Sequence, residues 1–463
     1  MCLTRRAFLK DSLATSIAMA SLGGVSTAMN SIEAKAANTE GYRALVCLFL
    51  FGGLDNHDMV LPYDSTSYNQ FVSLRGSLLQ AQGDSRARSS LLSLSTADNS
   101  QFGSRRFALP PELAGIKGLY DRGHAAIVGN VGPLLQPTNR GTFEQESVPL
   151  PARLFSHNDQ QATWQASAPE GASFGWGGRF VDALLPGNGS ADFSAISSFG
   201  DGLFLTGQQA RPYNVNPGGA ATQEVLEALE LEGNTQALAA ARAFLRGENY
   251  RGVNFFAQDM RNAARASIDA NRLYNAAVNE AQPILTEFPG SALGLGLRAV
   301  AEAINLRTSL QVNRQVFFVG LGGFDTHSGQ AQTLPELLRT VDSAVTAFHS
   351  EMERQGLSQS VTLFTASDFG RTLIANGDGT DHGWGGHQFV IGGSVQGGAI
   401  YGDLPPIATE HEQDSGNGRL IPTTSVEQFA APMGRWLGLN DSELNQALPN
   451  LSNFPGDSAL GFL

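Results

Sequence analysis

Four short apolar runs, rich in β-branched and aromatic residues, constrain the fold of this chain most strongly. Uninterrupted runs of this length are typical of strands that a parallel sheet buries on both faces. Residues 334–354, between the third and fourth runs, repeat apolar side chains at helical spacing, which gives a β-α-β unit and therefore a parallel pair of strands. We expect an α/β fold. The runs are residues 44–51 (ALVCLFLF), 125–131 (AAIVGNV), 315–321 (QVFFVGL) and 360–366 (SVTLFTA), with a shorter one at 389–391.

Residues 221–313 have a different composition, rich in Ala, Glu, Gln, Leu and Arg. Two or three helices are expected between residues 222 and 279, followed by one over residues 293–306 that leads into the third strand. The segment is too long for a simple crossover, so part of it is expected to be a helical insertion beside the sheet. Residues 80–108 and 132–152, rich in Ser, Gly, Arg and Pro, are expected to form loops.

Composition excludes several functional classes. Apolar residues make up 42% of the 463 residues, which is enough for a large core and excludes disorder for most of the chain. The net charge is −13, so the chain lacks the basic surface that binds nucleic acid and the polybasic segment that binds anionic lipid. We expect neither nucleic acid nor a membrane surface as its partner.

The N-terminus resembles a twin-arginine export signal. Arg5 and Arg6 are followed by Phe-Leu-Lys, a weakly apolar stretch over residues 13–29, and Ala-Lys-Ala at 34–36. The alternative is an N-terminal membrane helix, but its glycines and hydroxyl residues make the stretch a poor span. We expect residues 1–36 to be a signal peptide read by the twin-arginine machinery. The mature domain, 37–463, would then be periplasmic or secreted and have no membrane span.

Charged and imidazole side chains follow three of the strands, and a later glycine-rich loop carries two more histidines. Ligands of an open parallel sheet bind at the carboxyl ends of its strands, so these segments are expected to converge. Carboxylates and imidazoles together suit Zn²⁺, Mn²⁺ or a similar divalent ion, with one or two ions bound. The expected metal ligands are Asp55, Asp325, His327, Asp368, His382 and His387.

Each of these residues also has an ordinary structural interpretation. An aspartate after a strand often caps a helix, and the loops together could be turns that bind no metal. Arg371 is either a clamp for an anion or a salt-bridge partner of Asp368 or another nearby acid. The remaining histidines, His124, His349 and His411, are expected to be surface or core residues.

Ser156 and His157 begin a segment expected to be a helix running through Trp164. Ser156 and Asp159 have the spacing of a capping box. A nucleophilic serine at a helix N-terminus, activated by a metal, has the same pattern. His157 would either orient a substrate oxygen or pack against its neighbours.

Five motifs occur in order along the chain: FLFGGLDNHDMVLPYD, LFSHNDQQATWQ, GGFDTH, TASDFGRT and DHGWGGH. With the leader, they resemble the exported bacterial family catalogued as domain of unknown function 1501, which is grouped with the alkaline phosphatase and sulfatase superfamily. The resemblance covers essentially the whole mature chain. It implies a three-layer α/β/α sandwich with one or two divalent metals and a Ser, Thr or Cys nucleophile at a helix start.

Under this resemblance, Asp55 is similar to the metal carboxylate after the first strand. Asp325 and His327 resemble the acid and histidine that bind one metal. Asp368 resembles the acid of the other metal, and His382 a late histidine ligand. Ser156 is the best match to the nucleophile.

The chain departs from the superfamily after Asp368, where Phe369 stands in place of the usual histidine. A ligand of the second metal is therefore missing or comes from His387 or His57. Asp325 and His327 are also closer together than is usual in the superfamily.

The leading functional hypothesis is an exported, metal-dependent hydrolase of a phosphate or sulfate ester. Its substrate would be a small anionic ester or a surface glycan, and its catalytic residues Ser156, His157 and Arg371. The alternative, from another class, is a non-catalytic exported binding or assembly protein that retains the fold, with or without a structural metal.

Overall fold

The computed structural model describes residues 37–95, 100–200, 202–219, 233–245, 255–454 and 460–463. Residues from Ala36 to Leu463 form one compact unit. The expected signal peptide, residues 1–36, and the start of the expected helical insertion lie outside the described residues.

A nine-stranded sheet forms the centre of this unit, in the order β13-β5-β12-β9-β1-β8-β6-β7, with β14 also paired to β5. Three strands in the middle run parallel, and β12 is antiparallel to both of its neighbours. The strands are β1 (Arg43–Leu50), β5 (Ala125–Gly132), β6 (Ala195–Ser197), β7 (Tyr213–Asn214), β8 (Arg314–Leu321), β9 (Val361–Ser367), β12 (Gly386–Ile391), β13 (Ile400–Gly402) and β14 (Thr424–Ser425).

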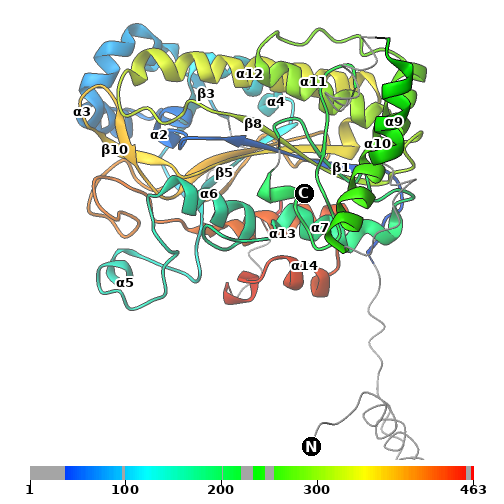
Figure 1. Cartoon of the computed structure of the whole chain (residues 1–463). Coiled ribbons are helices and arrows are strands. Elements are labelled where there is room, and N and C mark those ends of the chain that lie inside the picture. Colours follow the sequence, from blue (N-terminus) through cyan, green and yellow to red (C-terminus); the bar gives the residue numbers. More distant parts are fainter. Residues whose placement is uncertain (1–36, 96–99, 201, 220–232, 246–254, 455–459) are drawn as a thin grey trace, which may run out of the picture. The chain divides into compact units, whose positions relative to one another are not determined.

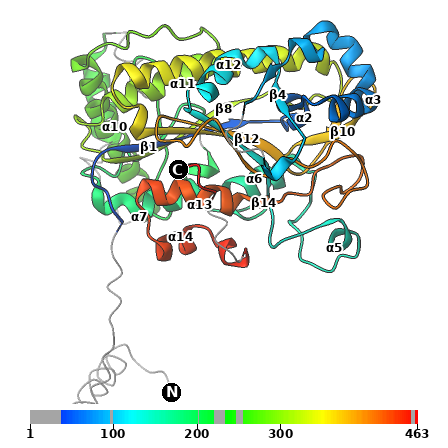
Figure 2. The same cartoon turned by 180° about the vertical axis from the view of Figure 1, so that it is seen from behind.

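Helices cover both faces of the sheet (Figures 1 and 2). Alternate residues of β1 point to opposite sides, so Val46 and Leu48 join one apolar cluster while Leu45 and Phe49 join the other. The first cluster includes α4 (Ala114–Asp121), α11 (Ala292–Asn305) and α12 (Gln330–Arg354). The second includes α6 (His157–Ala166), α7 (Trp176–Leu184), α13 (Val426–Leu437) and α14 (Asp441–Ala447). The predicted three-layer α/β/α fold with a mostly parallel sheet is confirmed.

Each apolar run of the sequence forms a strand, and the expected helix at 334–354 lies within α12. The helical segment contains α9 (Thr235–Leu245), α10 (Phe255–Glu280) and α11. Leu297 and Val300 of α11 are fully buried in the cluster that packs on β1. Thus α11 belongs to the helical layer on the sheet, because its apolar face is needed to cover β8 and β1.

Smaller elements complete the unit. The expected loop at 80–108 contributes to a three-stranded sheet of β2 (Leu61–Pro62), β4 (Phe107–Leu109) and β3 (Leu92–Ser93), and the loop at 132–152 contains α5 (Arg140–Glu144). The remaining helices are α2 (Asn56–Met59) and α3 (Ser65–Gln82). A hairpin of β10 (Arg371–Ala375) and β11 (Thr380–His382) follows β9. Within the described residues, no helix is both long and apolar enough to cross a membrane.

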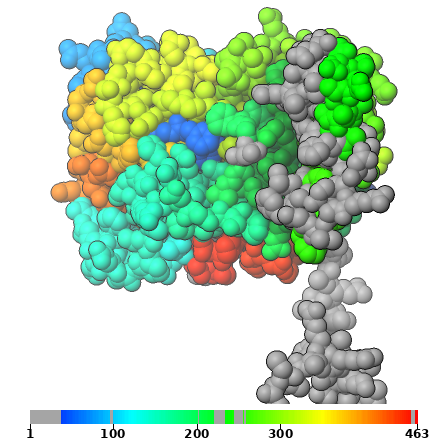
Figure 3. Space-filling view, viewed as in Figure 1, coloured from blue at the N-terminus to red at the C-terminus, as the bar shows by residue number. Residues whose placement is uncertain are grey.

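The registers of the central strands define where ligands can gather. Leu50 of β1 pairs with Leu321 of β8 and with Ser367 of β9, so the three strands end level with one another. Figure 3 shows the blue surface of the first described segment lying between teal, yellow and orange parts of the chain. These are the colours of the segments around α6, α12 and the β10–β11 hairpin, which converge at this edge.

Candidate metal centre

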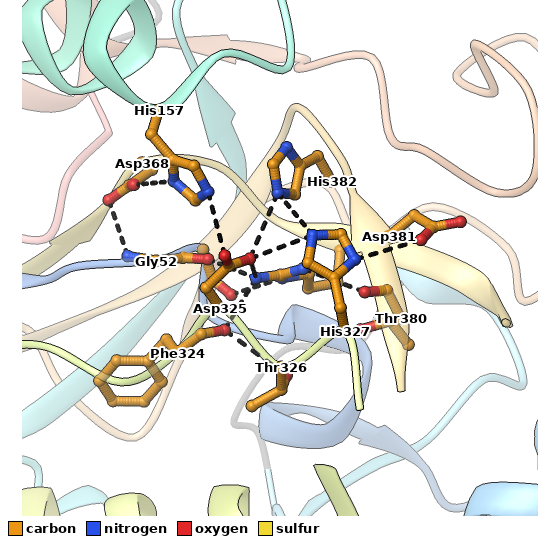
Figure 4. A network of polar contacts seen from close by, with 12 residues as sticks. Gly52, His157, Phe324, Asp325, Thr326, His327, Asp368, Thr380, Asp381 and His382 are labelled. Atoms are coloured by element: carbon orange, nitrogen blue, oxygen red, sulfur yellow. Dashed lines mark hydrogen bonds and ion pairs between the residues drawn. The ribbon is translucent and has the colours of Figure 1, made fainter. Parts of the chain in front are cut away.

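Four segments bring histidine and aspartate side chains together beyond the ends of β1, β8 and β9 (Figure 4). Asp325 and His327 follow β8, His157 is the first residue of α6, and His382 ends β11. The turn after β1 permits this close approach: Gly52 has a φ of 114°, and a Cβ there would overlap the backbone nitrogen of Asp325. The local sequence therefore places these side chains at one end of the sheet.

Asp325 lies at the centre of the group. Ligand atoms of His157, Asp325 and His382 all lie within 4.8 Å of one another. Nε2 of His157 is 3.5 Å from Oδ2 of Asp325, and Nε2 of His382 is 3.2 Å from Oδ1. Nε2 of His327 also lies 3.2 Å from Oδ1. Three imidazole nitrogens thus surround one carboxylate.

The opposite side of the His157 ring is held by Asp368. Nδ1 of His157 lies 2.6 Å from Oδ2 of Asp368. A carboxylate can only accept, so Nδ1–H donates, and in the neutral ring the lone pair is on Nε2. This hydrogen bond to Asp368 raises the pKa of His157, although burial opposes the shift. The lone pair of Nε2 is directed toward Asp325.

His382 and His327 are held in the same way. Nδ1 of His382 donates to the carbonyl oxygen of Phe155 at 2.7 Å, and Nδ1 of His327 donates to Oδ1 of Asp381 at 3.3 Å. Burial lowers the pKa of His382, which favours its neutral form. In both rings, Nε2 is therefore the atom with the free lone pair.

The donor set fits a divalent transition metal. The Nε2 atoms of His327 and His382 lie 2.8 Å apart. If both Nδ1 atoms keep their protons, two lone pairs face each other, and a cation or one added proton is needed between them. Imidazole nitrogens with their other nitrogen bonded to an acceptor, together with one carboxylate oxygen, form a typical Zn²⁺ ligand set. The residues whose ligand atoms all lie within 4.8 Å of one another are His157, Asp325 and His382, and His327 adjoins two of them, so that a shift of its ring would let it join the same ion.

Arg371 is a fully buried partner of Asp325. Its Nη2 lies 2.6 Å from Oδ1 of Asp325, while Nε and Nη1 donate to the carbonyl oxygens of Gly53 and Thr380. Burial alone would raise the pKa of Asp325, but the hydrogen bond and charge of Arg371 hold that pKa below its usual value. Of the two interpretations given above, the structure shows the salt bridge, to Asp325 rather than to Asp368.

Asp368 is fully buried and lies behind His157. Its Oδ2 also accepts from Nε2 of Gln161 at 2.8 Å, and its Oδ1 accepts from the backbone nitrogen of Gly52 at 3.1 Å. Both oxygens are thus occupied by protein donors. Its position is that of a residue that orients a ligand, which differs from the direct metal contact expected from the sequence.

Asp55 occupies a different environment from the one expected. Its Oδ1 accepts from the backbone nitrogen of His57 and so caps α2, which is the structural alternative noted for such residues. Both oxygens pair with the buried guanidinium of Arg75, and Oδ2 also accepts from Gln330. Because these donors occupy the carboxylate, the structure places Asp55 outside the group around Asp325.

His387 is also placed apart from the group. Its Nδ1 accepts from the backbone nitrogen of Asn130 at 3.0 Å, so the proton of the neutral ring is on Nε2. Burial lowers the pKa of His387 to about 3. With one nitrogen accepting and the other protonated, neither is free for a metal.

Ser156 stands at the N-cap position of α6, next to His157. Its hydroxyl makes no bond to the helix backbone and donates to Oδ2 of the buried Asp159 at 2.9 Å. The capping box indicated by the spacing of Ser156 and Asp159 therefore does not form, and the two residues are linked side chain to side chain instead.

Two partners of the site, Asp381 and Phe155, and the partner of Asp55, Arg75, were not predicted from the sequence. Asp381 directly precedes His382, and this adjacency was a usable signal. The sequence contains no signal for the other two partners. The partner atom of Phe155 is a backbone carbonyl, and Arg75 lies within a helix, 20 residues after Asp55. Phe155 has a φ of 71°, an uncommon conformation for an aromatic residue.

The comparisons with known proteins support the predicted family. A family model described as "Protein of unknown function (DUF1501)" matches residues 42–450. This confirms the resemblance indicated by the five motifs. Among curated proteins, none matches this sequence.

The solved structures to which this chain is similar include the following two. Ps i-CgsB in complex with k-i-k-neocarrahexaose has 10% identity and a TM-score of 0.35, covering 90% of this chain and 77% of its own. The PsFucS1 sulfatase from Pseudoalteromonas sp. has 10% identity and a TM-score of 0.36, covering 91% and 72%. Both scores are low, so neither the ligand nor the activity of these proteins is carried over to this chain.

Proposed function

We propose that this chain, which belongs to the DUF1501 family of proteins of unknown function, is an exported metal-dependent hydrolase of phosphate or sulfate esters. The observation that supports this most is the convergence of three Nε2 atoms on the carboxylate of Asp325. Each of those rings has its Nδ1 directed at an acceptor. Without a ligand, such a preorganised donor set lowers the stability of the fold, because it keeps lone pairs facing one another.

The proposed metal ligands are His157, His327, His382 and Asp325. A divalent cation held by them would supply Lewis acidity toward an ester oxygen. Asp368 orients the His157 ring, and Arg371 keeps Asp325 ionised. These residues therefore define the position and charge of the site before substrate arrives.

Ser156 is the proposed nucleophile. Its hydroxyl hydrogen already points at Oδ2 of Asp159, a buried carboxylate that can accept the proton as Oγ attacks phosphorus or sulfur. The ester oxygen then leaves with the electrons of the broken bond and takes a proton from solvent. Water next attacks the same phosphorus or sulfur and loses its proton to solvent, the bond to Oγ breaks, and Oγ takes back its proton from Asp159. The substrate class is a small anionic ester or an ester group on a surface glycan.

A non-catalytic binding or assembly protein is the second candidate, and one observation favours it. The side chain of Arg371 is fully buried and bonded to Asp325 and to backbone carbonyls. It is thus not free to neutralise a transferred phosphoryl or sulfuryl group. In this case the metal would have a structural role only.

Turnover of aryl esters separates the two candidates. Purified protein loaded with Zn²⁺ or Mn²⁺ is assayed with 4-nitrophenyl phosphate and 4-nitrophenyl sulfate. The hydrolase proposal expects release of nitrophenol by the parent protein and at least a 100-fold loss in His382→Gln and Ser156→Ala. His411→Gln, a loop histidine outside the cluster, is the matched control and should retain activity. Full metal loading without turnover of either ester would favour the binding protein.

A further inference from the structure

A second cluster of possible metal ligands lies away from the candidate metal centre. His124 stands between α4 and β5, immediately before the first residue of β5. His349 and Glu353 lie one turn apart on α12, so they face the same way. Helix α12 begins three residues after His327, and His349 is about 28 Å farther along the helix axis. The cluster therefore belongs to the other end of α12.

The three ligand atoms form a compact triangle. Nδ1 of His124 is 2.9 Å from Nε2 of His349. Oε1 of Glu353 is 3.5 Å from the first of these nitrogens and 3.6 Å from the second. Ligand atoms around a tetrahedral Zn²⁺ are about 3.4 Å apart when each is about 2.1 Å from the ion. One ion can therefore contact all three atoms with only small side-chain adjustments.

A hydrogen bond between the two histidines explains only part of this geometry. An N–H···N bond accounts for the 2.9 Å separation. It leaves Oε1 of Glu353 with only long contacts to the two rings, 3.5 Å to His124 and 3.6 Å to His349. Burial lowers the pKa of His349 to about 4, so this ring is neutral at physiological pH and has a lone pair to share. A shared cation satisfies all three groups at once.

Access and charge also suit an ion. The side chain of His349 is almost completely buried, whereas those of His124 and Glu353 are 26% and 34% exposed. Solvent can therefore reach the open side of the triangle and supply a further ligand. In the described part of the chain, the guanidinium beside Glu353 is that of Arg122, whose Nη1 lies 3.6 Å from Oε1. Its side chain is 52% exposed, so it can move away without a burial cost.

We infer that His124, His349 and Glu353 form a second binding site for a divalent transition-metal ion such as Zn²⁺. The ion connects the end of α12 to the start of β5, two segments far apart in the sequence. Its effect is to stabilise the folded state, because the unfolded chain does not hold the three ligands together. This inference is independent of any catalytic role of the centre around Asp325.

Zn²⁺ itself is the probe that tests the site. The full chain is stripped with chelator, and Zn²⁺ binding is measured by calorimetry and by metal content after dialysis. Glu353→Gln should weaken one class of site at least tenfold and remove part of the Zn²⁺-dependent rise in Tm. Glu336→Gln removes the same charge from the same helix and should leave both unchanged. Arg122→Gln should tighten the site, because it removes a competing positive charge.

A His382→Gln background separates the two metal sites. In that background, the remaining tight Zn²⁺ should disappear on adding Glu353→Gln or His124→Asn. His124→Asn changes a partly exposed side chain, so it serves if Glu353→Gln fails to fold as judged by circular dichroism. Unchanged Zn²⁺ stoichiometry and an unchanged Tm shift in both variants would show that the histidines share only a hydrogen bond, and the inference would be overturned.

Discussion

Nδ1 of His157 lies 2.6 Å from Oδ2 of Asp368, a carboxylate with no exposed surface. The two residues are 211 positions apart, and each stands where a secondary-structure element meets the same edge of the sheet. The contact fixes the rotation of the imidazole ring and leaves Nε2 directed at Asp325. A buried acceptor behind a ligating histidine is the usual way in which a protein orients a metal ligand.

Replacing Asp368 should therefore weaken metal binding without removing a ligand. Asp368→Asn offers an amide that can donate to Nδ1 and so favours the wrong tautomer of His157. We expect the affinity for Zn²⁺ to fall 10- to 100-fold, as measured by calorimetry. Asp441→Asn, an exposed aspartate paired with Arg435, is the control and should bind like the parent. Equal affinities in the two variants would remove Asp368 from the account.

Arg371 provides a test that separates a structural role from a role in binding anions. Arg371→Met leaves the carbonyl groups of Gly53 and Thr380 without their donor and Asp325 without its cation. We expect the free energy of unfolding to fall by about 2–4 kcal/mol in urea titrations of metal-free protein. Arg435→Met, which breaks an exposed pair, should change it by less than about 1 kcal/mol. A fully stable Arg371→Met protein would instead indicate a free anion clamp.

The buried histidines predict a loss of stability in acid. Burial lowers the pKa of His387 to about 3, well below the usual value near 6.5. The unfolded chain therefore takes up a proton as the pH falls below about 6.5, whereas the folded protein does so only near pH 3. The contribution of His387 to the free energy of unfolding is complete above pH 6.5 and decreases as the pH falls. At pH 5 it has decreased by about 2 kcal/mol.

His387→Gln tests this prediction directly. Its unfolding free energy in urea, with chelator present, should decline less steeply than that of the parent between pH 7 and pH 5. His57→Gln should show the same change, because burial and the nearby Arg75 lower the pKa of His57 to about 3 as well. A pH dependence identical to that of the parent in both variants would contradict the prediction.

Export is predicted from residues 1–36 alone. Changing both Arg5 and Arg6 to lysine should leave uncleaved precursor in the cytoplasm, because the paired arginines are what the twin-arginine receptor reads. Cell fractionation followed by immunoblotting measures this. Lys10→Arg keeps the charge and the arginine pair and should be exported normally. Mature protein outside the cytoplasm in undiminished amount would show that the leader is of another kind.

Much of the fold could be predicted because the central strands are buried on both faces. Such strands must be continuous apolar runs, so residues 44–51 and 315–321 could be recognised as strands from the amino-acid sequence alone. The level strand ends follow from parallel pairing, which is why Asp325 and Asp368 were expected at one edge. Helix α11 was expected from the helix-favouring composition of its segment, but its place in the layer was not, because composition does not show which surface a helix covers.

The roles of the individual carboxylates could not be predicted in this way. Asp55 and Asp325 follow their strands in nearly the same local sequence. What distinguishes them is Arg75 of α3, which pairs with Asp55, and Arg371 of β10, which pairs with Asp325. His387 and His382 likewise differ in the partner of Nδ1, which accepts from the backbone of Asn130 in the first and donates to the carbonyl of Phe155 in the second. These partners come from distant segments, so only the folded chain brings them together.

The central claim is that His157, His327, His382 and Asp325 together bind one divalent metal ion. Anomalous diffraction at the zinc edge, from crystals of protein reloaded with Zn²⁺, tests it most directly. We predict a strong anomalous peak about 2.0–2.2 Å from Nε2 of each histidine and from a carboxylate oxygen of Asp325. Zinc-soaked crystals with no peak between these four side chains would contradict the claim.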